Sequence, residues 1–401
     1  MALSNLISPP ALTDTIHLTF LLDHAIRHKL SVAVWRLPNE AVTYAIISAT
    51  PQLLNYNLSL EDQLPGFIFA PFNTSSDRIY LPADYCFSFS KGRLNSPTSE
   101  KEVVSTAWLS DLMKTTDAGR ILPRVYINTN APSTPTTTKD FFLDLVSRGI
   151  TDIEHGRFEK VVLSRTKTVT VSSSFDVTEG FQKLSNLYQN ALVSFVSIPE
   201  TGSWLGATPE VLVSVKDKKI FRTTALAGTL PYSEGTNLKT VAWTQKDIEE
   251  QALVERYIIS CFKKIRLREY DEHGPRTVVA GNLMHLKSDF MVDMEATNFP
   301  QLGSAMLQLL HPTSAVCGVP LDATLEFIKK NENYNREFYT GYLGPVNFNN
   351  SIDIFVNLRC LQVLKEKVIL YAGAGITQDS IPENEWEETE LKLRTLLKII
   401  E

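Results

Sequence analysis

The stretch Ala372–Lys392, which reads AGAGITQDSIPENEWEETELK, joins a Gly-Ala-Gly segment to a strongly signalled helix. Ser380 and Glu383 form the S-x-x-E pattern of a capping box, and Pro382 lies where the first turn of that helix would be. Glycine commonly occupies tight turns because it has no β-carbon. We therefore expect a tight glycine turn, then a capping box, and then a helix that continues to the end of the stretch.

The predicted helix carries three charged residues on one face. Glu385, Glu388 and Lys392 are separated by three and four residues, a spacing that stacks their side chains. Two carboxylates and an ammonium beside a glycine turn suit a small anionic ligand that is held partly through a metal ion. The alternative is an ordinary C-terminal helix with a solvated charged face. In either case the face that packs on the core consists of Trp386, Leu393, Leu397 and Ile400.

The overall composition is that of an ordinary globular protein. Of the 401 residues, 43% are hydrophobic and 21% are charged, and the net charge is −6. The chain has no long basic run, which argues against nucleic-acid binding, and no run of 18 apolar residues, which argues against a membrane span. The four cysteines are scattered and the first residues do not resemble a signal peptide, so we expect a cytoplasmic protein with reduced thiols.

Predicted strands follow one another in groups and do not alternate with helices. This order favours an α+β fold with large layered antiparallel β-sheets flanked by helices. The polar stretch Asn130–Lys139 divides the chain, so we expect residues 1–135 to be a variable N-terminal part of the fold and residues 136–401 to be the catalytic region. The main predicted helices cover residues 20–28, 141–156 and 245–264, and the main predicted strands cover residues 160–171, 191–199, 203–207, 210–216, 220–226, 346–349, 352–364 and 367–375.

Two charged residues fall in otherwise apolar patterns. Glu250 lies on the apolar side of the helix predicted at residues 245–264, where an unpaired carboxylate needs a metal ion or a lysine as its partner. Lys160 begins a strand of apolar and small residues, and burial lowers the pKa of a lysine and can make it a general base. The alternatives are that Glu250 reaches water at the rim of the buried face and that Lys160 extends from a strand edge into water.

Two further charged residues follow strand patterns. Glu210 comes after Gly206–Pro209, between two predicted strands, where a carboxylic acid could donate a proton to a leaving group. The alternative for Glu210 is a polar turn residue. Arg359 interrupts the apolar strand predicted at residues 352–364, which indicates either a forked carboxylate clamp or a structural ion pair.

Eight strings occur in order between residues 137 and 400. They are KVVLSR from Lys160, WLGATPE from Trp204, TALAGT from Thr224, KDIEEQALV from Lys246, HL at His285, HPTSAVCGVP from His311, REFYTGYLG from Arg336 and the AGAGIT…EWEET region from Ala372. Together these strings resemble the chorismate-utilising enzymes and, within that family, the isochorismate synthases. Eight matches in order are far more specific than any one of them. The first 135 residues resemble the family only weakly.

The resemblance implies catalytic and metal-binding roles for five residues. Lys160 would activate a water molecule that attacks C2 of chorismate, and Glu210 would protonate the departing C4 hydroxyl. Glu250 and Glu385 would bind Mg²⁺, with support from Glu388, so that the metal holds the ring carboxylate. The chain would then be a Mg²⁺-dependent isochorismate synthase, which is an isomerase.

The resemblance also implies a set of substrate-binding residues. Arg359, Tyr339 and Lys392 would anchor the second carboxylate and its enolpyruvyl arm. The other residues that the resemblance places around the substrate are Thr224, Gly228, Thr229, His285, Gly373 and Gly375.

A few positions distinguish between branches of the family. Lys160 stands where aminating relatives carry Gln, and Ala227 stands where aminodeoxychorismate synthases carry a nucleophilic lysine, so water is the expected nucleophile. The string HPTSAVCG resembles isochorismate synthases more than salicylate synthases, although Ser314 and Cys317 depart from the usual pattern. The resemblance implies a monomer without a glutaminase subunit, whose product would serve menaquinone, siderophore or salicylate biosynthesis.

Two other functions stay open at this point. A salicylate synthase would form isochorismate and then eliminate pyruvate from it. A non-catalytic homologue would bind chorismate without turnover.

Overall fold

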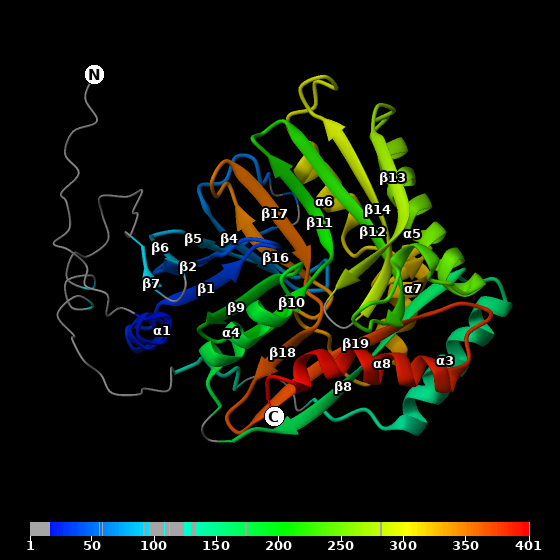
Figure 1. Ribbon diagram of the computed structural model, residues 1–401, viewed down its shortest axis with the longest axis horizontal. Helices are drawn as coiled ribbons and strands as arrows, with labels where there is room; N and C mark the ends of the chain where they lie inside the picture. Colours follow the sequence, from blue (N-terminus) through cyan, green and yellow to red (C-terminus); the bar gives the residue numbers. More distant parts are fainter. Residues whose placement is uncertain are drawn as a thin grey trace.

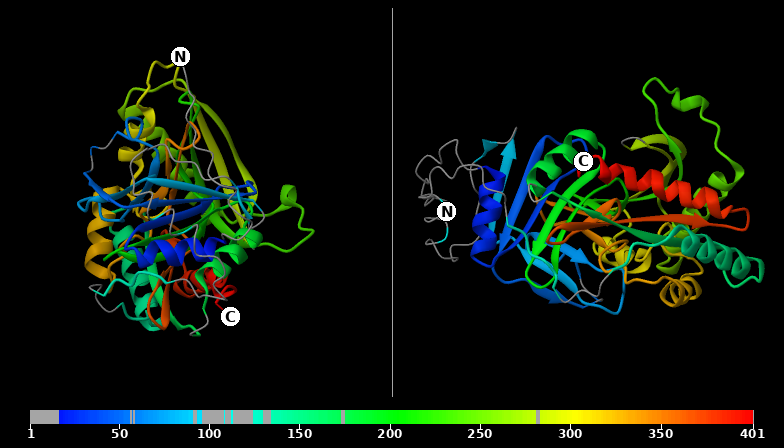
Figure 2. Two further views of the ribbon diagram at one scale, coloured as in Figure 1. Left: turned by 90° about the vertical axis from the view of Figure 1, so that its left-hand side faces the viewer. Right: turned by 90° about the horizontal axis from the view of Figure 1, so that it is seen from below.

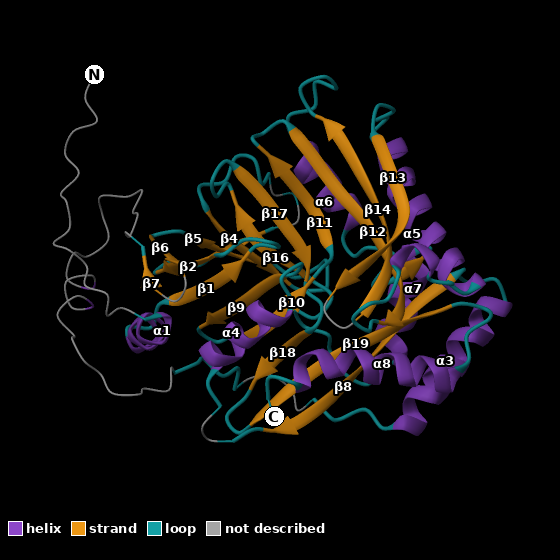
Figure 3. Cartoon of the chain, viewed as in Figure 1, coloured by secondary structure: helices purple, strands orange, loops and turns teal. Residues whose placement is uncertain are grey.

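The computed structural model describes residues 17–400 except 56, 58, 91–92, 96–107, 109–111, 113–123, 130–133, 173–174 and 281–282. The start of the polar stretch expected to divide the chain lies outside the described residues. Within them the chain forms two large antiparallel sheets with α-helices on their outer faces, as Figure 1 and, by secondary structure, Figure 3 show. No described helix is both long enough and apolar enough to span a membrane.

The first sheet takes strands from the beginning, the middle and the end of the chain. In spatial order these strands are β15 (Gly318–Val319), β8 (Lys160–Thr170), β19 (Lys367–Ile376), β18 (Cys360–Val363), β10 (Gly202–Thr208), β9 (Leu192–Ile198), β1 (Ser31–Arg36), β2 (Val42–Ser48), β6 (Tyr85–Ser90) and β7 (Arg93–Leu94). Most residues of the central strands are buried on both faces. This burial explains why these strands read as nearly continuous apolar runs in the sequence.

The second sheet is built in the same way. In spatial order its strands are β13 (Asp271–Ala280), β14 (Leu283–Asp293), β12 (Ile220–Pro231), β11 (Val211–Lys216), β17 (Ser351–Val356), β16 (Tyr342–Val346), β4 (Gly66–Ala70), β5 (Arg78–Pro82) and β3 (Gln52–Leu54). Strands from before residue 135 therefore pair with later strands in both sheets, and neither sheet belongs to one part of the chain.

Helices cover the outer face of each sheet, so the molecule has the layer order helix, sheet, sheet, helix. The helices α1 (Leu18–Arg27), α4 (Val177–Leu187), α3 (Lys139–Glu154) and α8 (Pro382–Leu397) pack on the first sheet, and α5 (Gln245–Lys264) and α6 (Leu302–Leu310) pack on the second. Helix α7 (Leu321–Asn331) lies against β8 and β15. Figure 2 shows this arrangement from two further sides.

The layers enclose separate apolar cores. One core lies between the first sheet and α1, α4 and α8, and another lies between the second sheet and α5 and α6. A third, rich in aromatic rings, lies between the two sheets; it includes Trp35, Phe69, Trp204, Tyr339 and Tyr371. The sheets are therefore held face to face by this inner core.

Most predicted elements are confirmed. Helix α5 has the predicted bounds, because Thr244 and Asp247 form a capping box at its start and Leu253, Val254 and Ile258 face the core. Helix α3 begins after Thr138, whose hydroxyl accepts the Phe141 N–H. The α+β class with layered antiparallel sheets is confirmed as well.

Three local predictions are wrong. Gly373 and Gly375 do not form a tight turn but lie inside β19, paired with Ser164 and Val162. The predicted capping box is absent, because the residue before α8 is Ile381 and the Ser380 hydroxyl accepts the Thr377 N–H instead. Residues 346–349 were predicted to be a strand, but only Val346 is in β16, and Asn347 and Asn349 have positive φ angles in the turn that follows it.

The strand predicted at residues 352–364 is also wrong, and the error matters for the site. This run is two strands in two different sheets: β17 in the second and β18 in the first. The chain crosses between the sheets at residues 357–359, and Arg359 has a φ angle of 47° at the crossing. Alternation of apolar residues does not reveal such a crossing, because both halves are buried strands.

Candidate functional site

Two neighbouring crossings between the sheets create the site. Glu210 lies where β10 of the first sheet leads into β11 of the second, and Arg359 lies where β17 leads back into β18. The two crossings are hydrogen-bonded to each other: the Val356 N–H donates to the Glu210 carbonyl at 3.0 Å, and the Ala207 N–H donates to the Arg359 carbonyl at 3.0 Å. Glu210 and Arg359, 149 positions apart in the sequence, are therefore held beside one opening between the sheets.

A cavity of about 90 Å³ lies at this point. Ligand pockets commonly enclose about 300–1,000 Å³, so the side chains around the cavity are drawn together in this structure. Of the residues that the sequence assigned to catalysis, metal binding or substrate binding, eleven line the cavity: Glu210, Gly228, Thr229, Glu250, His285, Tyr339, Arg359, Gly373, Gly375, Glu388 and Lys392. The sequence prediction is thus concentrated in one place in the fold.

Lys160 and Glu250 form a buried ion pair at the wall of the cavity. Lys160 is fully buried, and its Nζ lies 2.8 Å from Glu250 Oε1. Burial alone would raise the pKa of Glu250, but the Lys160 ammonium and Lys246 lower it below the ordinary value. The structure therefore does not support the alternatives in which the two side chains reach water. Lys160 does not extend into water, and Glu250 has a lysine as its partner, as the sequence predicted for an inward-facing carboxylate. The Lys160 Nζ makes no hydrogen bond of good geometry within the described part of the chain.

The absence of a side chain at Gly375 makes room for this ion pair against β19. A β-carbon at Gly375 would collide with Glu250 Oε1 and would lie 3.1 Å from Lys160 Cε. Gly375 is needed here because the ion pair packs directly on the strand, although its φ angle is not in the left-handed region. The glycine identified in the sequence as a turn residue is thus a contact residue in a strand.

Glu210 is buried and faces several charged groups. Its pKa is raised to about 7, chiefly by burial, which the positive charges of Lys160, Lys392 and Arg359 only partly offset. A carboxylic acid with a pKa near neutrality holds its proton in a useful range for a general acid. Glu210 is not an exposed turn residue, which was its alternative interpretation.

Arg359 meets a histidine, and no ion pair between Arg359 and a carboxylate is seen among the described residues. Arg359 Nη2 donates to His285 Nε2, with the two nitrogens 2.5 Å apart, and His285 Nδ1 lies 2.7 Å from the Gly228 carbonyl oxygen. An arginine can only donate and a carbonyl can only accept, so His285 must be neutral with its proton on Nδ1. Burial and Arg359 lower the pKa of His285 well below its ordinary value, in agreement with this tautomer.

Arg359 is itself available to an anion. Burial lowers the pKa of the Arg359 guanidinium to about 10, and its contacts are neutral groups, namely His285 and, at 3.3 Å, the Ala280 carbonyl. A partly buried guanidinium without a carboxylate partner gains from a bidentate carboxylate ligand. This geometry favours the carboxylate clamp over the structural ion pair.

Tyr339, Gly373 and Lys392 form another part of the cavity lining. The Lys392 Nζ is 2.7 Å from Glu388 Oε1 and donates to the Gly373 carbonyl at 2.8 Å. The Tyr339 hydroxyl would lie 3.1 Å from a β-carbon at Gly373, and its ring stacks on Tyr371 with centroids 5.2 Å apart. The predicted one-sided arrangement of Glu388 and Lys392 on the last helix is confirmed by this contact.

The three proposed metal ligands are each held by a lysine. Glu385 is buried, and its Oε1 lies 2.6 Å from the Nζ of Lys246. Burial raises the pKa of Glu385, Lys246 opposes this shift, and the charge of Glu388 adds to it. In the described part of the chain, no three His, Cys, Asp or Glu side chains converge closely enough to hold a metal ion.

The donor chemistry nevertheless fits a magnesium ion. All three groups are carboxylates, which Mg²⁺ prefers, and the buried Oε2 of Glu385 has no hydrogen-bond partner among the described residues. Burial alone would lower the pKa of Lys246, but the nearby carboxylates raise it above the ordinary lysine value. These carboxylates are Glu385, Glu388 and Glu250, so one ammonium faces the whole set.

Lys246 begins the KDIEEQALV string, but the sequence predicted no role for it. A signal was available in the sequence, since Lys246 precedes Glu250 by four residues on the same helix face. Thr224 is the opposite case. It lies two residues before the cavity-lining Leu226 on β12, but its hydroxyl donates to the Val211 carbonyl at 3.1 Å and it does not line the cavity.

The chain is similar to known proteins over most of its length. The family model described as "Chorismate binding enzyme" matches residues 93–401. The chain is 26% identical over 257 residues to the vibriobactin-specific isochorismate synthase of Vibrio cholerae, and 31% identical over 265 residues to isochorismate synthase DhbC of Bacillus subtilis. It is also 27% identical over 268 residues to a salicylate synthase of Mycolicibacterium paratuberculosis.

These matches span 63%, 63% and 64% of this chain and 64%, 66% and 57% of the respective relatives, so each covers less than two thirds of the relative's length. Among solved structures, the menaquinone-specific isochorismate synthase MenF of Escherichia coli is similar over 97% of this chain and 92% of that chain, with a TM-score of 0.76 and 21% identity. This similarity shows that the two chains share a fold.

Proposed function

The chain belongs to the chorismate-binding enzyme family, and we propose that it is an isochorismate synthase that acts on chorismate. The reaction exchanges one hydroxyl for another: water adds at C2 of the ring, the double bonds shift, and the C4 hydroxyl leaves as water. It needs one group that takes a proton from the attacking water and one that gives a proton to the leaving hydroxyl.

The observation that carries the proposal is the pairing of Lys160 and Glu210 at one cavity. Lys160 contacts Glu250 and Gly375, which line it, and Glu210 lines it directly. Lys160 is the base in this proposal. Glu210, whose pKa is about 7, is the acid. No other titratable side chain that lines the cavity combines full burial with a pKa raised to neutrality among the described residues.

The remaining residues bind and orient the substrate in this proposal. Arg359 and Lys392 offer positive charge to the carboxylate on the enolpyruvyl arm, and the Tyr339 hydroxyl donates a hydrogen bond beside them. His285 keeps Arg359 in place through its Nε2. Thr229 and Gly228 form the cavity wall next to Ala227, whose methyl group cannot act as a nucleophile, so water remains the attacking group.

Mg²⁺ would be held by Glu250 and Glu385, with Glu388 in support, and would supply positive charge to the ring carboxylate of chorismate. The protein residues then have separate duties: Arg359 and Lys392 hold one end of the substrate, and Lys160 and Glu210 move protons at its ring. The deep burial of Lys160 and Glu210 excludes bulk water from these groups.

The test is a product analysis. The protein is incubated with chorismate and Mg²⁺, and the products are separated by chromatography, with an EDTA sample and a Lys160→Gln variant as controls. Isochorismate formed only by the Mg²⁺-containing wild type supports the proposal. Salicylate together with pyruvate would make the chain a salicylate synthase, as its similarity to one such enzyme allows. Binding of chorismate, measured by calorimetry, without any product would make it a non-catalytic homologue.

A further inference from the structure

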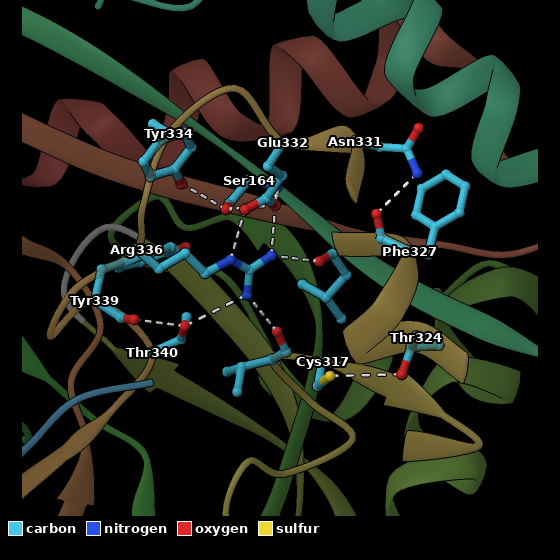
Figure 4. Close-up of polar contacts among 12 residues, drawn as sticks. Ser164, Cys317, Thr324, Phe327, Asn331, Glu332, Tyr334, Arg336, Tyr339 and Thr340 are labelled. Carbon is cyan, nitrogen blue, oxygen red and sulfur yellow. Dashed lines mark hydrogen bonds and ion pairs between the residues drawn. The ribbon is translucent and has the colours of Figure 1, made fainter. Parts of the chain in front are cut away.

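A second buried ion pair lies next to the cavity, in the loop between α7 and β16. Glu332 and Arg336 are each 2% exposed at the side chain. The Arg336 Nε donates to Glu332 Oε2 at 2.8 Å and its Nη2 donates to Glu332 Oε1 at 2.5 Å, which makes a forked pair (Figure 4). Burial alone would lower the pKa of the Arg336 guanidinium, but Glu332 raises it above its ordinary value. Arg336 therefore stays charged.

The rest of the guanidinium ties three segments together. Arg336 donates to the Val162 carbonyl at 2.8 Å, to the Val316 carbonyl at 2.9 Å and to the Thr340 hydroxyl at 3.4 Å. With the two bonds to Glu332, these contacts use all five N–H donors of an arginine. Val162, Val316 and Thr340 all line the cavity, although Arg336 itself does not.

The carboxylate of Glu332 extends the same network to the strand of the proposed base. Its Oε1 accepts hydrogen bonds from the N–H and the hydroxyl of Ser164, both at 2.8 Å, and the Ser164 hydroxyl also bonds to the Tyr334 hydroxyl at 2.6 Å. Ser164 lies in β8, four residues after Lys160. The ion pair thus holds β8 at two positions, Val162 and Ser164.

The turn that presents Tyr339 is strained and depends on this support. Glu337 has a φ angle of 48° and Thr340 one of 60°, and a positive φ is unfavourable for a β-branched residue such as Thr340. The Tyr339 N–H donates to the Arg336 carbonyl at 2.8 Å, and Arg336 also holds the Thr340 hydroxyl. Such strain persists only where surrounding contacts fix the conformation.

We propose that Arg336 is a positioning residue for the reaction: its fully bonded guanidinium sets the place of Tyr339 and of β8, the strand that carries Lys160. This inference rests on the proposed function. Arg336 does not line the cavity, so its effect on the reaction acts through Tyr339 and Lys160. A displacement of about 1 Å in a reacting group can cost about 10²-fold in rate, so loss of the fork is expected to lower kcat/KM by about 10–100-fold.

The experiment compares Arg336→Lys with Arg36→Lys. Arg36 is also a buried arginine, and it donates to five backbone carbonyls, those of Leu37, Glu40, Tyr188, Gln189 and Ala191. None of these residues lines the cavity. Both variants replace a buried guanidinium with an ammonium, and their unfolding temperatures measure the loss of stability that this replacement causes in each. Only Arg336→Lys is expected to lower kcat/KM by about 10–100-fold.

A double-mutant cycle with Tyr339→Phe separates positioning from general damage. If Arg336 acts through Tyr339, the loss caused by Arg336→Lys shrinks by about fivefold or more when the Tyr339 hydroxyl is already absent. Multiplicative losses, or an Arg336→Lys rate no lower than that of Arg36→Lys, would overturn the inference. If Arg336→Lys does not fold, Thr340→Val, which removes the hydroxyl that Arg336 holds next to Tyr339, takes its place in the cycle and is interpreted in the same way.

The wild-type product assay keeps the two proposals apart. A wild type that forms no isochorismate refutes the proposed function, and the cycle is then run on the dissociation constant of chorismate measured by calorimetry. A wild type that forms isochorismate, together with an Arg336→Lys variant of unchanged kcat/KM, refutes only the positioning role.

Discussion

Two cation–carboxylate pairs lie beside β8, Lys160–Glu250 at its start and Arg336–Glu332 next to Val162 and Ser164, and they differ in how many of their hydrogen-bonding groups have partners. In the Arg336–Glu332 pair every guanidinium donor has a partner, and the carboxylate accepts two further hydrogen bonds from Ser164. In the Lys160–Glu250 pair the ammonium lies 2.8 Å from the carboxylate but makes no hydrogen bond of good geometry among the described residues. The saturated pair suits a scaffold, and the unsaturated pair suits a site that must accept a ligand or move a proton.

The chemistry of the two cations fits this division. Arginine offers a rigid fork of five donors and keeps its proton, so it can tie several backbone segments together. Lysine is a compact charge that can exchange a proton and change partners. Arg336 accordingly bonds three segments around the cavity, whereas Lys160 has a single carboxylate, Glu250, which the proposed function also assigns to the metal.

The largest expected effect comes from removing one carboxylate charge from each pair. Glu250→Gln should reduce isochorismate formation to background, because it removes both the partner of Lys160 and a proposed Mg²⁺ ligand. Glu332→Gln should instead lower the free energy of unfolding by about 3–5 kcal/mol, since it leaves the buried Arg336 charge without its counter-ion. Initial rates and thermal unfolding curves of both variants provide the measurement.

The predicted difference between the two pairs is wrong if Glu250→Gln mainly lowers stability and Glu332→Gln mainly lowers activity. A Glu250→Gln variant with wild-type turnover, or full wild-type activity in EDTA, would contradict the metal assignment. Glu385→Gln is the matched variant, because Glu385 is also paired with a lysine and belongs to the same proposed ligand set. It should lose activity like Glu250→Gln without disturbing Lys160.

The next effect concerns Glu210, the proposed acid. Glu210→Gln keeps the size of the side chain but cannot donate a proton of comparable acidity, and loss of a general acid typically costs about 10²–10⁴-fold in rate. The reverse reaction should fall by a similar factor, because the same group must then act as the base. Initial rates from chorismate and from isochorismate, with a binding titration of chorismate, test this. Loss of binding together with rate would indicate a structural role for Glu210.

A smaller effect is expected from the glycines on which the reactive pair rests. In Gly375→Ala the new methyl group collides with the Glu250 carboxylate, so the ion pair with Lys160 has to shift, and we expect a loss of about 10²-fold in kcat/KM. Gly373→Ala is the matched variant from the same strand, whose β-carbon would come no closer than 3.0 Å to the Leu163 carbonyl. It should lose only several-fold. Equal losses in the two variants would show that Gly375 has no special relation to the ion pair.

The sequence predicted the elements that local chemistry decides. Helix α5 has a capping residue, Thr244, and an apolar face, and the buried strands have runs of β-branched residues. It did not predict the crossing at residues 357–359, because the left-handed conformation of Arg359 is imposed by the two sheets and has no local signal. It also misread Gly375, whose reason to be glycine is a contact with Glu250 from a distant helix.

The candidate site was predicted by resemblance to a family, not by spacing. Sequence spacing alone related Glu385, Glu388 and Lys392, which share one helix face, and the structure places Glu388 and Lys392 in contact. Pairs such as Lys160–Glu250 join residues that are 90 positions apart in the sequence, and no local pattern encodes such a contact. The Arg336 network was not predicted either. Its fork joins Glu332 and Arg336, which are four positions apart, but its contacts with Val162, Val316 and Ser164 come from distant segments.

The smallest expected effect is a pH dependence of chorismate binding, which distinguishes Glu210 from the Arg336–Glu332 pair. Between about pH 6 and pH 8 Arg336 keeps its charge, since its pKa is raised, whereas Glu210, with a pKa of about 7, changes from neutral to negative. Chorismate carries two carboxylates, so it should bind more tightly when Glu210 is neutral. Its dissociation constant in EDTA, where turnover is expected to be absent, should therefore rise several-fold from pH 6 to pH 8.

By linkage, binding of chorismate near pH 7.5 should take up a fraction of a proton, which calorimetry in two buffers of different ionisation enthalpy measures directly. In Glu210→Gln the uptake should vanish, while Glu332→Gln, if folded, should keep it. Proton release on binding, or uptake that persists in Glu210→Gln, would assign the titration to another group and remove the physical basis for Glu210 as the acid.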